Sequence, residues 1–200
     1  MAAKSTLKNM VLCLTLVCLF CSAVLAVVYA VTLDPIAEAA QAKTNASIAR
    51  VLPEFTGNPE LMTVYVDGTG YQYYSTGSGC AVLSSVNGFG GPLNLMVGIC
   101  DDADNNPVVF NTAVLSHSET PGLGAKCTSD SFAGQFKGWN PGEKKLLVKK
   151  DGGDVDAITA STISSRAYTL AIANAVEAYR RIRSAAVQNV NEEEGGNDNE

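Results

Sequence analysis

Near its start the chain carries one stretch that a water-soluble fold does not readily accommodate: from Met10 to Val31 no residue is charged. At about 1.5 Å of rise per residue, a helix of this length crosses a hydrocarbon layer of roughly 30 Å. The sequence therefore predicts a membrane-spanning helix over residues 10–31. Lys4 and Lys8 precede it. Because basic flanks stay on the cytoplasmic side, residues 1–9 are expected in the cytoplasm and the remainder on the outer face of the membrane.

A cleaved signal peptide is the competing interpretation, because Val28-Tyr29-Ala30 has the small-residue spacing of a cleavage site. The apolar core of a signal peptide, however, runs to about 7–15 residues, which is shorter than this stretch. A retained anchor is therefore the prediction. A lipid-anchored cysteine is disfavoured, because each candidate cysteine follows a large residue: Leu12-Cys13, Val17-Cys18 and Phe20-Cys21.

The negative charge is concentrated at the C-terminal end of the chain. The formal net charge is −6, yet five of the 20 acidic residues lie within residues 192–200, which leaves the rest nearly neutral. A nearly neutral body has no basic face with which to hold nucleic acid. Residues 189–200 are rich in Asn, Gly and Glu and lack apolar partners, so a disordered, solvated tail is predicted there.

The six cysteines divide into two groups. Three lie in the apolar stretch, and three follow it: Cys80, Cys100 and Cys127. The outer compartment permits one disulfide among these three, but no spacing singles out a pair. No cluster of histidine and cysteine has the spacing of a metal site, so no metal is expected.

Two helical patterns frame the soluble part of the chain. Asp34-Pro35 is typical of a helix start, and an alanine-rich pattern from Ile36 to Leu52 ends before Pro53. Residues 32–60 are therefore predicted as a linker or stalk that contains a helix. From Thr159 onwards apolar residues recur at helical spacing, which predicts a long C-terminal helix whose first turn covers residues 160–165.

Between these helices the sequence changes to short β-branched and aromatic runs broken by turn residues. The five runs are Met62 to Val66, Tyr71 to Tyr74, Cys80 to Val86, Leu93 to Ile99 and Val108 to Leu115. The third run ends at Gly88-Phe89-Gly90-Gly91, which is either a plain turn or a place where backbone approaches a ligand closely. Residues 61–188 are thus predicted to form one α+β domain, with a mainly antiparallel sheet and a long C-terminal helix.

A segment rich in hydroxyl groups lies where the C-terminal helix is expected to begin. From Asp156 to Ser165, five of ten side chains are Ser or Thr. A helix N-terminus has unpaired N–H groups and a positive partial charge, so it readily holds a phosphate. Helix capping alone is the alternative explanation of such a cluster.

A second unusual segment, His117 to Gly124, lies upstream. Pro121 fixes its own φ angle, and Gly122 and Gly124 permit backbone conformations that other residues avoid. The segment is therefore predicted to be a rigid turn that presents the dipeptide Glu119-Thr120. An ordinary surface turn is the alternative.

Together the two segments resemble the signature segments of the FMN-binding domain family, in which flavin mononucleotide is esterified through its phosphate to a threonine. By this resemblance Thr162 is expected to carry FMN. Ala160 stands where glycine is commonest and Ser161 where alanine is commonest, and both replacements are small. The motif falls on Asp156, Thr159, Ala160, Ser161, Thr162 and Ser164. In similar proteins the second segment borders the flavin, which implies binding roles for Glu119, Thr120, Gly122, Leu123 and Gly124.

The resemblance also implies a maturation partner. A threonine hydroxyl is a poor nucleophile at neutral pH, and no base is evident near it in the sequence. In the family a separate Mg²⁺-dependent flavin transferase moves FMN from FAD onto the threonine, and Asp156 is expected to belong to its recognition sequence.

The combination of one span and one FMN site is similar to the G subunits of Rnf-type ion-translocating electron-transport complexes. It implies an electron-relay component without substrate chemistry of its own, in contact with other membrane and iron-sulfur or flavin subunits. The resemblance also implies a location in a bacterial inner membrane, with the soluble domain on the periplasmic or outer face. The C subunit of the Na⁺-translocating NADH:quinone reductase is a close alternative, although it is usually longer between anchor and flavin motif. A free-standing flavin reductase outside the cytoplasm and an anchored binding module without flavin are the remaining alternatives.

Overall fold

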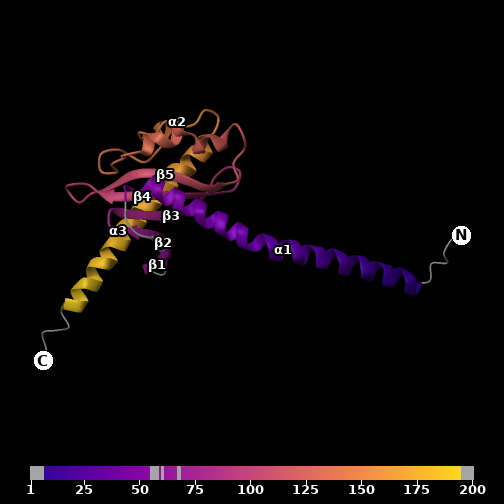
Figure 1. Cartoon of the computed structure of the whole chain (residues 1–200). Coiled ribbons are helices and arrows are strands. Elements are labelled where there is room, and N and C mark those ends of the chain that lie inside the picture. The colour runs from indigo at the N-terminus through magenta and orange to yellow at the C-terminus, as the bar shows by residue number, and fades with distance from the viewer. Residues whose placement is uncertain (1–6, 55–58, 60, 67–68, 195–200) are drawn as a thin grey trace, which may run out of the picture. The chain divides into compact units, whose positions relative to one another are not determined.

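The computed structural model describes residues 7–54, 59, 61–66 and 69–194 of the chain. It divides into two compact units, residues 1–44 and 45–200. Figure 1 labels the helices and strands along the chain. The predicted α+β class is confirmed: an N-terminal apolar helix, a five-stranded antiparallel sheet and a long C-terminal helix are all present.

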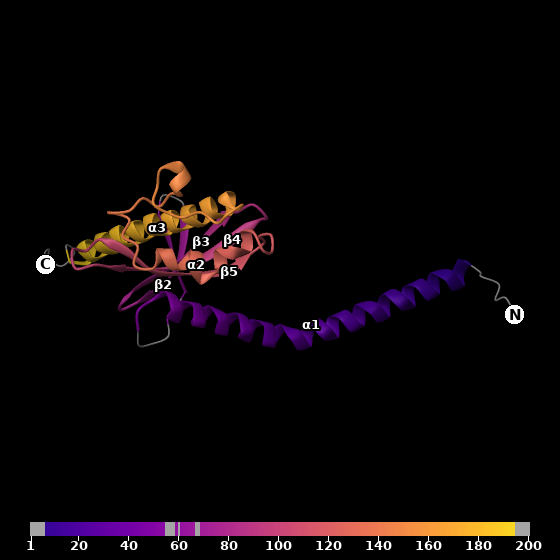
Figure 2. The same cartoon turned by 90° about the horizontal axis from the view of Figure 1, so that it is seen from above.

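The first helix, α1, spans Leu7–Val51 without interruption. The sequence predicted two helical segments with a new start at Asp34-Pro35, but Pro35 lies inside the single helix. Proline removes one backbone hydrogen bond and usually kinks a helix without ending it when the flanks are strongly helical. Figure 2 shows a bend partway along α1. Within the described part of the chain, this is the one helix long and apolar enough to cross a membrane.

The sheet is a meander in which each strand pairs antiparallel with its neighbour in sequence. All five predicted runs are strands, each extended by one or more residues at an end. Their bounds are β1 Leu61–Val66, β2 Thr69–Thr76, β3 Gly79–Asn87, β4 Pro92–Asp101 and β5 Pro107–His117. The predicted turn at Asp67-Gly68 lies outside the described residues.

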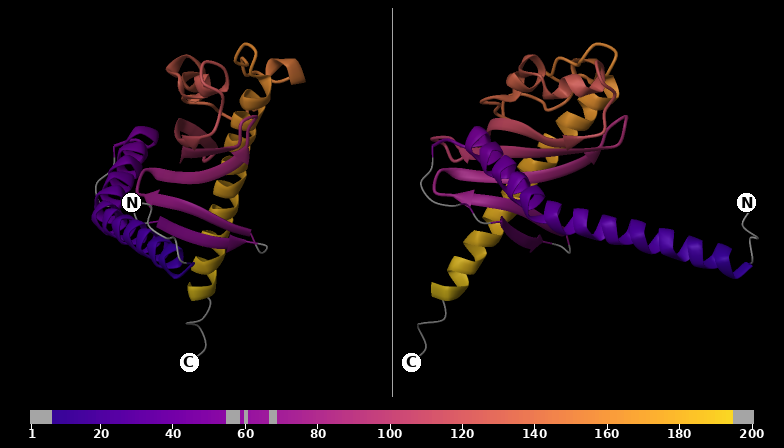
Figure 3. Two further views of the ribbon diagram at one scale, coloured as in Figure 1. Left: turned by 90° about the vertical axis from the view of Figure 1, so that its right-hand side faces the viewer. Right: turned by 45° about the vertical axis from the view of Figure 1, so that its right-hand side comes forward.

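Helix α3, Thr162–Glu194, covers one face of this sheet (Figure 3). Its apolar stripe, which includes Tyr168 and Ile172, joins the inward side chains of β3, β4 and β5 in the larger core. α3 extends beyond residue 188, where the tail was expected to begin, and residues 195–200 lie outside the described part.

The other face of the sheet is covered by the last turn of α1. Ile48, Val51 and Leu52 are buried there with side chains of the central strands, including Met96. Gly98 of β4 makes the close approach possible, because a Cβ atom at this position would collide with the carbonyl oxygen of Val51.

The long connection from β5 to α3 contains four short helices that no periodic pattern predicted. They are η1 Gly124–Thr128, α2 Asp130–Ala133, η2 Gly134–Phe136 and η3 Lys149–Asp151. Elements of three to five residues are too short to produce a hydrophobic period. Phe132, Phe136 and Trp139 of this connection are buried, and Phe136 stacks on Tyr168 with ring centroids 5.1 Å apart. These aromatic residues belong to the core.

Candidate functional site

The two signature segments meet at one pocket of about 380 Å³, although more than thirty residues of chain separate them. Three backbone segments form its walls: the turn after β3, the loop after β5, and the beginning of α3. The lining residues are Phe89, Glu119, Thr120, Leu123, Gly124, Ala160, Ser161, Thr162, Ile163 and Ser164.

The start of α3 is held by hydrogen bonds within the hydroxyl-rich segment. The Ser165 hydroxyl accepts from the Ile158 N–H and donates to the Ser161 carbonyl, both at 2.9 Å. The Ser161 N–H donates to the Ile158 carbonyl at 3.0 Å. The helix therefore begins at Thr162, two residues later than the first turn predicted from the pattern. Thr162 is half-buried and faces the pocket, and the first N–H groups of a helix have no acceptor within it.

Ala160 has a left-handed backbone conformation, with φ of 59°. This region costs an L-residue about 1–2 kcal/mol, whereas glycine adopts it freely. This geometry gives a physical reason for the glycine that the family resemblance leads one to expect at position 160. Among residues that are strained in this conformation, alanine has the smallest side chain. Its methyl group does not fill the pocket.

Glu119 is the most buried charged residue at the site, with 5% of its surface exposed. Its Oε1 atom accepts from the Phe89 N–H at 2.8 Å, and its Oε2 atom accepts from the Ser164 hydroxyl at 2.9 Å. Its own N–H donates to Nδ1 of His117 at 3.2 Å. His117, the single histidine of the chain, thus supports the loop.

The loop after Glu119 closes in a turn. The Thr120 carbonyl accepts from the N–H groups of Leu123 and Ala125 at 3.2 and 3.1 Å. Gly122 lies in this turn with φ of 77°, as the glycine pattern predicted. The turn brings Thr120 and Leu123 to the pocket and leaves Gly122 outside its lining.

Large apolar side chains lie exposed around the pocket. Phe89 is 69% exposed, Leu123 44% and Ile163 52%. Exposed apolar groups around a concave site are typical of ligand binding, because a ligand with a flat apolar face removes them from water. Phe89 and Ile163 were not among the predicted site residues. The glycines around Phe89 were the sequence feature that could have indicated its role. Ile163 could not be distinguished from the other apolar residues that recur at helical spacing.

Besides Gly122, two of the predicted residues, Thr159 and Asp156, lie away from the pocket lining. Thr159 is exposed. Asp156 is also exposed, and its position is fixed from two sides. Its N–H and carbonyl pair with the side-chain amide of Gln135 at 2.9 and 3.2 Å, and its carboxylate lies 2.7 Å from the Lys149 ammonium.

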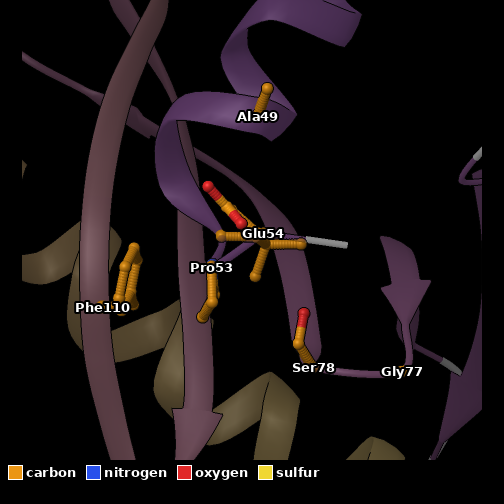
Figure 4. A pocket seen from close by; sticks show the side chains of 7 residues that line it. Ala49, Pro53, Glu54, Gly77, Ser78 and Phe110 are labelled. Atoms are coloured by element: carbon orange, nitrogen blue, oxygen red, sulfur yellow. The ribbon is translucent and has the colours of Figure 1, made fainter. Parts of the chain in front are cut away.

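A larger pocket, of about 840 Å³, lies between the end of α1 and the β2–β3 turn (Figure 4). Its lining includes Glu54, Ser78 and Phe110 and none of the predicted site residues. In the part of the chain that the structure describes, no group of three metal-ligating side chains occurs. The smaller pocket is therefore the candidate site.

Burial disfavours the thiolate form of the cysteines beyond α1. Burial raises the pKa of the Cys127 thiol to about 11, with a further contribution from the negative charge of Glu119. Burial likewise raises the pKa values of Cys80 and Cys100. All three are free thiols in this structure.

Comparison with known proteins places this site in a family context. Residues 88–177, which contain all three walls of the pocket, match the family model of the FMN-binding domain. The G subunit of the ion-translocating oxidoreductase complex of Shewanella baltica is 34% identical over 183 residues, covering 82% of this chain and 84% of that protein.

Two further relatives come from other organisms. The G subunit of the proton-translocating ferredoxin:NAD(+) oxidoreductase complex of Clostridium ljungdahlii is 32% identical over 170 residues, covering 82% of this chain and 86% of its own. The G subunit of the ion-translocating oxidoreductase complex of Methanosarcina acetivorans is 41% identical over 87 residues, or 44% of each chain.

Proposed function

Because the chain belongs to the family of G subunits of ion-translocating oxidoreductase complexes and carries their FMN-binding domain, we propose that it relays electrons through an FMN esterified to Thr162. The observation that carries this proposal is the meeting of both signature segments at one pocket with Thr162 in its wall. The chain's own residues hold and cover the cofactor, and when bound FMN supplies one-electron transfer between neighbouring redox centres.

The start of α3 suits the phosphate end of FMN. None of the described residues lining the pocket is Lys or Arg, so the phosphate charge would be met by the N–H groups and positive end of the helix. The hydroxyl of Thr162 makes no hydrogen bond among the described residues, which leaves it available for esterification. The neighbouring Ser161 and Ser164 are buried, and the Ser164 hydroxyl donates to Glu119.

The exposed apolar side chains around the pocket suit the isoalloxazine end of FMN. Phe89, Leu123 and Ile163 would cover the flat, apolar isoalloxazine ring and exclude water from it. A phosphoester leaves the ring chemically unaltered, so ring contacts and water access would set its potential.

Loading of Thr162 requires an external catalyst. Glu119 is the one carboxylate lining the pocket in the described chain, and its side chain pairs with Phe89 and Ser164, so no described base contacts the Thr162 hydroxyl. We propose that a Mg²⁺-dependent flavin transferase supplies the base. The Thr162 Oγ1 atom attacks the FMN phosphorus of FAD, the bond between the two phosphates breaks, AMP leaves, and the threonine proton passes to the transferase. Asp156, exposed and rigidly held, is available for recognition.

The location of the domain follows from α1. We propose that residues 10–31 form a single membrane span, with residues 1–9 in the cytoplasm and the FMN-binding domain, residues 61–188, on the outer face. Residues 32–60 would link the two. As a G subunit the chain would contact other membrane, iron-sulfur or flavin subunits. The names of its relatives support the coarser point that they are subunits of oxidoreductase complexes.

The intact mass of the denatured protein from its native host tests the covalent link. The unsubstituted chain is expected to carry an adduct equal to FMN less one water, and Thr162→Val is expected to lack it. Thr63→Val, which changes an exposed threonine of β1 outside the pocket and both signature segments, is the matched control and keeps the adduct. An adduct on Thr162→Val, or no adduct on the unsubstituted chain, would refute the proposal.

A further inference from the structure

We infer that Glu119 is the positioning residue of the pocket: its buried carboxylate ties the turn after β3 to the first turn of α3 and so fixes where Thr162 is presented. The inference rests on the proposed function of Thr162 as the FMN attachment site. Glu119 acts through its neighbours, because its hydrogen bonds go to Phe89 and Ser164 and not to Thr162.

The carboxylate joins segments that are distant in sequence. Phe89 precedes Glu119 by 30 residues, and Ser164 follows it by 45. Ser164 lies two positions after Thr162 in the same helical turn, so a constraint on Ser164 passes to Thr162 through the backbone. The pocket wall and the attachment residue are thereby held in one arrangement.

The Glu119 carboxylate fits in its place because two neighbouring residues are glycines, which have no side chain. A Cβ atom on Gly88 would collide with Oε1 of Glu119, and one on Gly124 would collide with Oε2. The Gly124 Cβ would also lie 2.6 Å from the Ser164 hydroxyl oxygen. The side chain therefore occupies a close-fitting slot between two backbone segments, which is what a positioning role requires.

The charge of Glu119 has no cationic partner among the described residues. Arg166, a nearby cation on α3, donates two hydrogen bonds to Asp151 at 2.6 Å each. The carboxylate is stabilised instead by its two donors and by the positive end of α3. Because a buried carboxylate depends on every donor that it has, loss of either contact is expected to displace the side chain and the segments attached to it.

The rate at which a flavin transferase loads the purified full-length apo-protein in detergent, with FAD and Mg²⁺ present, tests the inference. Glu119→Ala is expected to load at least about ten-fold more slowly, since a small misplacement of a reacting group has effects of this size. Glu119→Gln is expected to recover most of the rate, because its amide oxygen still accepts from the Phe89 N–H and its amide group can bond to the Ser164 hydroxyl.

Thr112→Val is the matched control. It removes another buried hydrogen bond to α3, the 2.7 Å contact between Thr112 and the Tyr168 hydroxyl, without touching the pocket. It is expected to load at the rate of the unsubstituted chain. Far-UV circular dichroism of each apo-protein checks the fold, and Ser164→Ala replaces Glu119→Ala if that variant does not fold. It is then expected to load several-fold more slowly.

The outcomes separate this inference from the proposal on which it rests. If the unsubstituted chain is not loaded, the proposed function fails, and the inference with it. Loading of the unsubstituted chain together with equal rates for Glu119→Ala or its replacement Ser164→Ala would overturn the positioning role alone. So would a loss in Thr112→Val as large as that in the Glu119 variant, because the effect would then be one of general stability.

Discussion

The Ile158 N–H donates to the Ser165 hydroxyl at 2.9 Å, and this contact closes the hydroxyl-rich segment against the first turn of α3. Ser165 is fully buried, and its hydroxyl also donates to the Ser161 carbonyl. The cluster of hydroxyls thus serves two purposes: Ser165 builds the turn, while Thr162 faces the pocket.

Substitution of Ser165 should destabilise the apo-domain. Ser165→Ala leaves the Ile158 N–H buried without a partner, and we expect a loss of about 1–3 kcal/mol in the free energy of unfolding. Urea denaturation followed by circular dichroism measures it. Ser116→Ala removes an exposed hydroxyl, whose hydrogen bond with Asn94 lies at the surface, and should change the free energy by less than about 0.5 kcal/mol. Equal values for the two variants would contradict the role of Ser165 in the turn.

Replacing Ala160 by glycine should stabilise the domain. At φ of 59°, alanine is strained and glycine is not, so Ala160→Gly is expected to gain about 0.5–1 kcal/mol after the entropy of the unfolded glycine is counted. Ala157→Gly, at an exposed position where φ is not positive, is the control and should lose stability slightly. Denaturant titration of both variants measures the difference, and destabilisation by Ala160→Gly would show that the strain is absent in solution.

The stability of the domain should fall at alkaline pH because of Cys127. Its pKa is raised from the ordinary value of 9.0 to about 11 in the folded state. The unfolded chain therefore releases the thiol proton first, so the contribution of Cys127 is complete below pH 9 and is lost as the pH rises towards 11. Thermal unfolding of the unsubstituted chain and of Cys127→Ala between about pH 8 and pH 11 should show the two curves converging. Parallel curves would mean that the thiol is solvated.

Asp156 should affect maturation and not folding. Its side chain is exposed, and its one ion pair, with Lys149, lies at the surface. Surface pairs of this kind contribute little to stability. Asp156→Asn is expected to reduce loading of Thr162 by the transferase several-fold with an unchanged urea midpoint. Glu143→Gln, at another exposed acid of the same connection, is the control. Normal loading of Asp156→Asn would remove this residue from the recognition sequence.

The strands and long helices could be predicted from the sequence because each has a recognisable pattern of apolar residues. The five short runs between turn residues correspond to β1–β5, and the apolar stripe after Thr162 corresponds to α3. The continuity of α1 through Pro35 could not be predicted, since proline is compatible with both a helix start and a kinked interior position.

The candidate site was partly predictable for a different reason. Glu119 and Thr162 stood out through their motifs, and the structure brings both to one pocket. Phe89 reaches that pocket only because β3 ends beside the loop that follows β5, which is a tertiary relationship. The pairing of Gln135 with the Asp156 backbone is likewise a contact between two irregular segments, and no sequence period marks such segments.

The order of the strands has a consequence for biogenesis. Since β1 to β5 pair in sequence order, the sheet can assemble hairpin by hairpin as the chain emerges. The pocket cannot, because its last wall belongs to α3, which follows all five strands in the chain and covers the sheet only after they have been made. A flavin on Thr162 would therefore be found only on domains that have folded, because the transferase would modify Thr162 only after the pocket has formed.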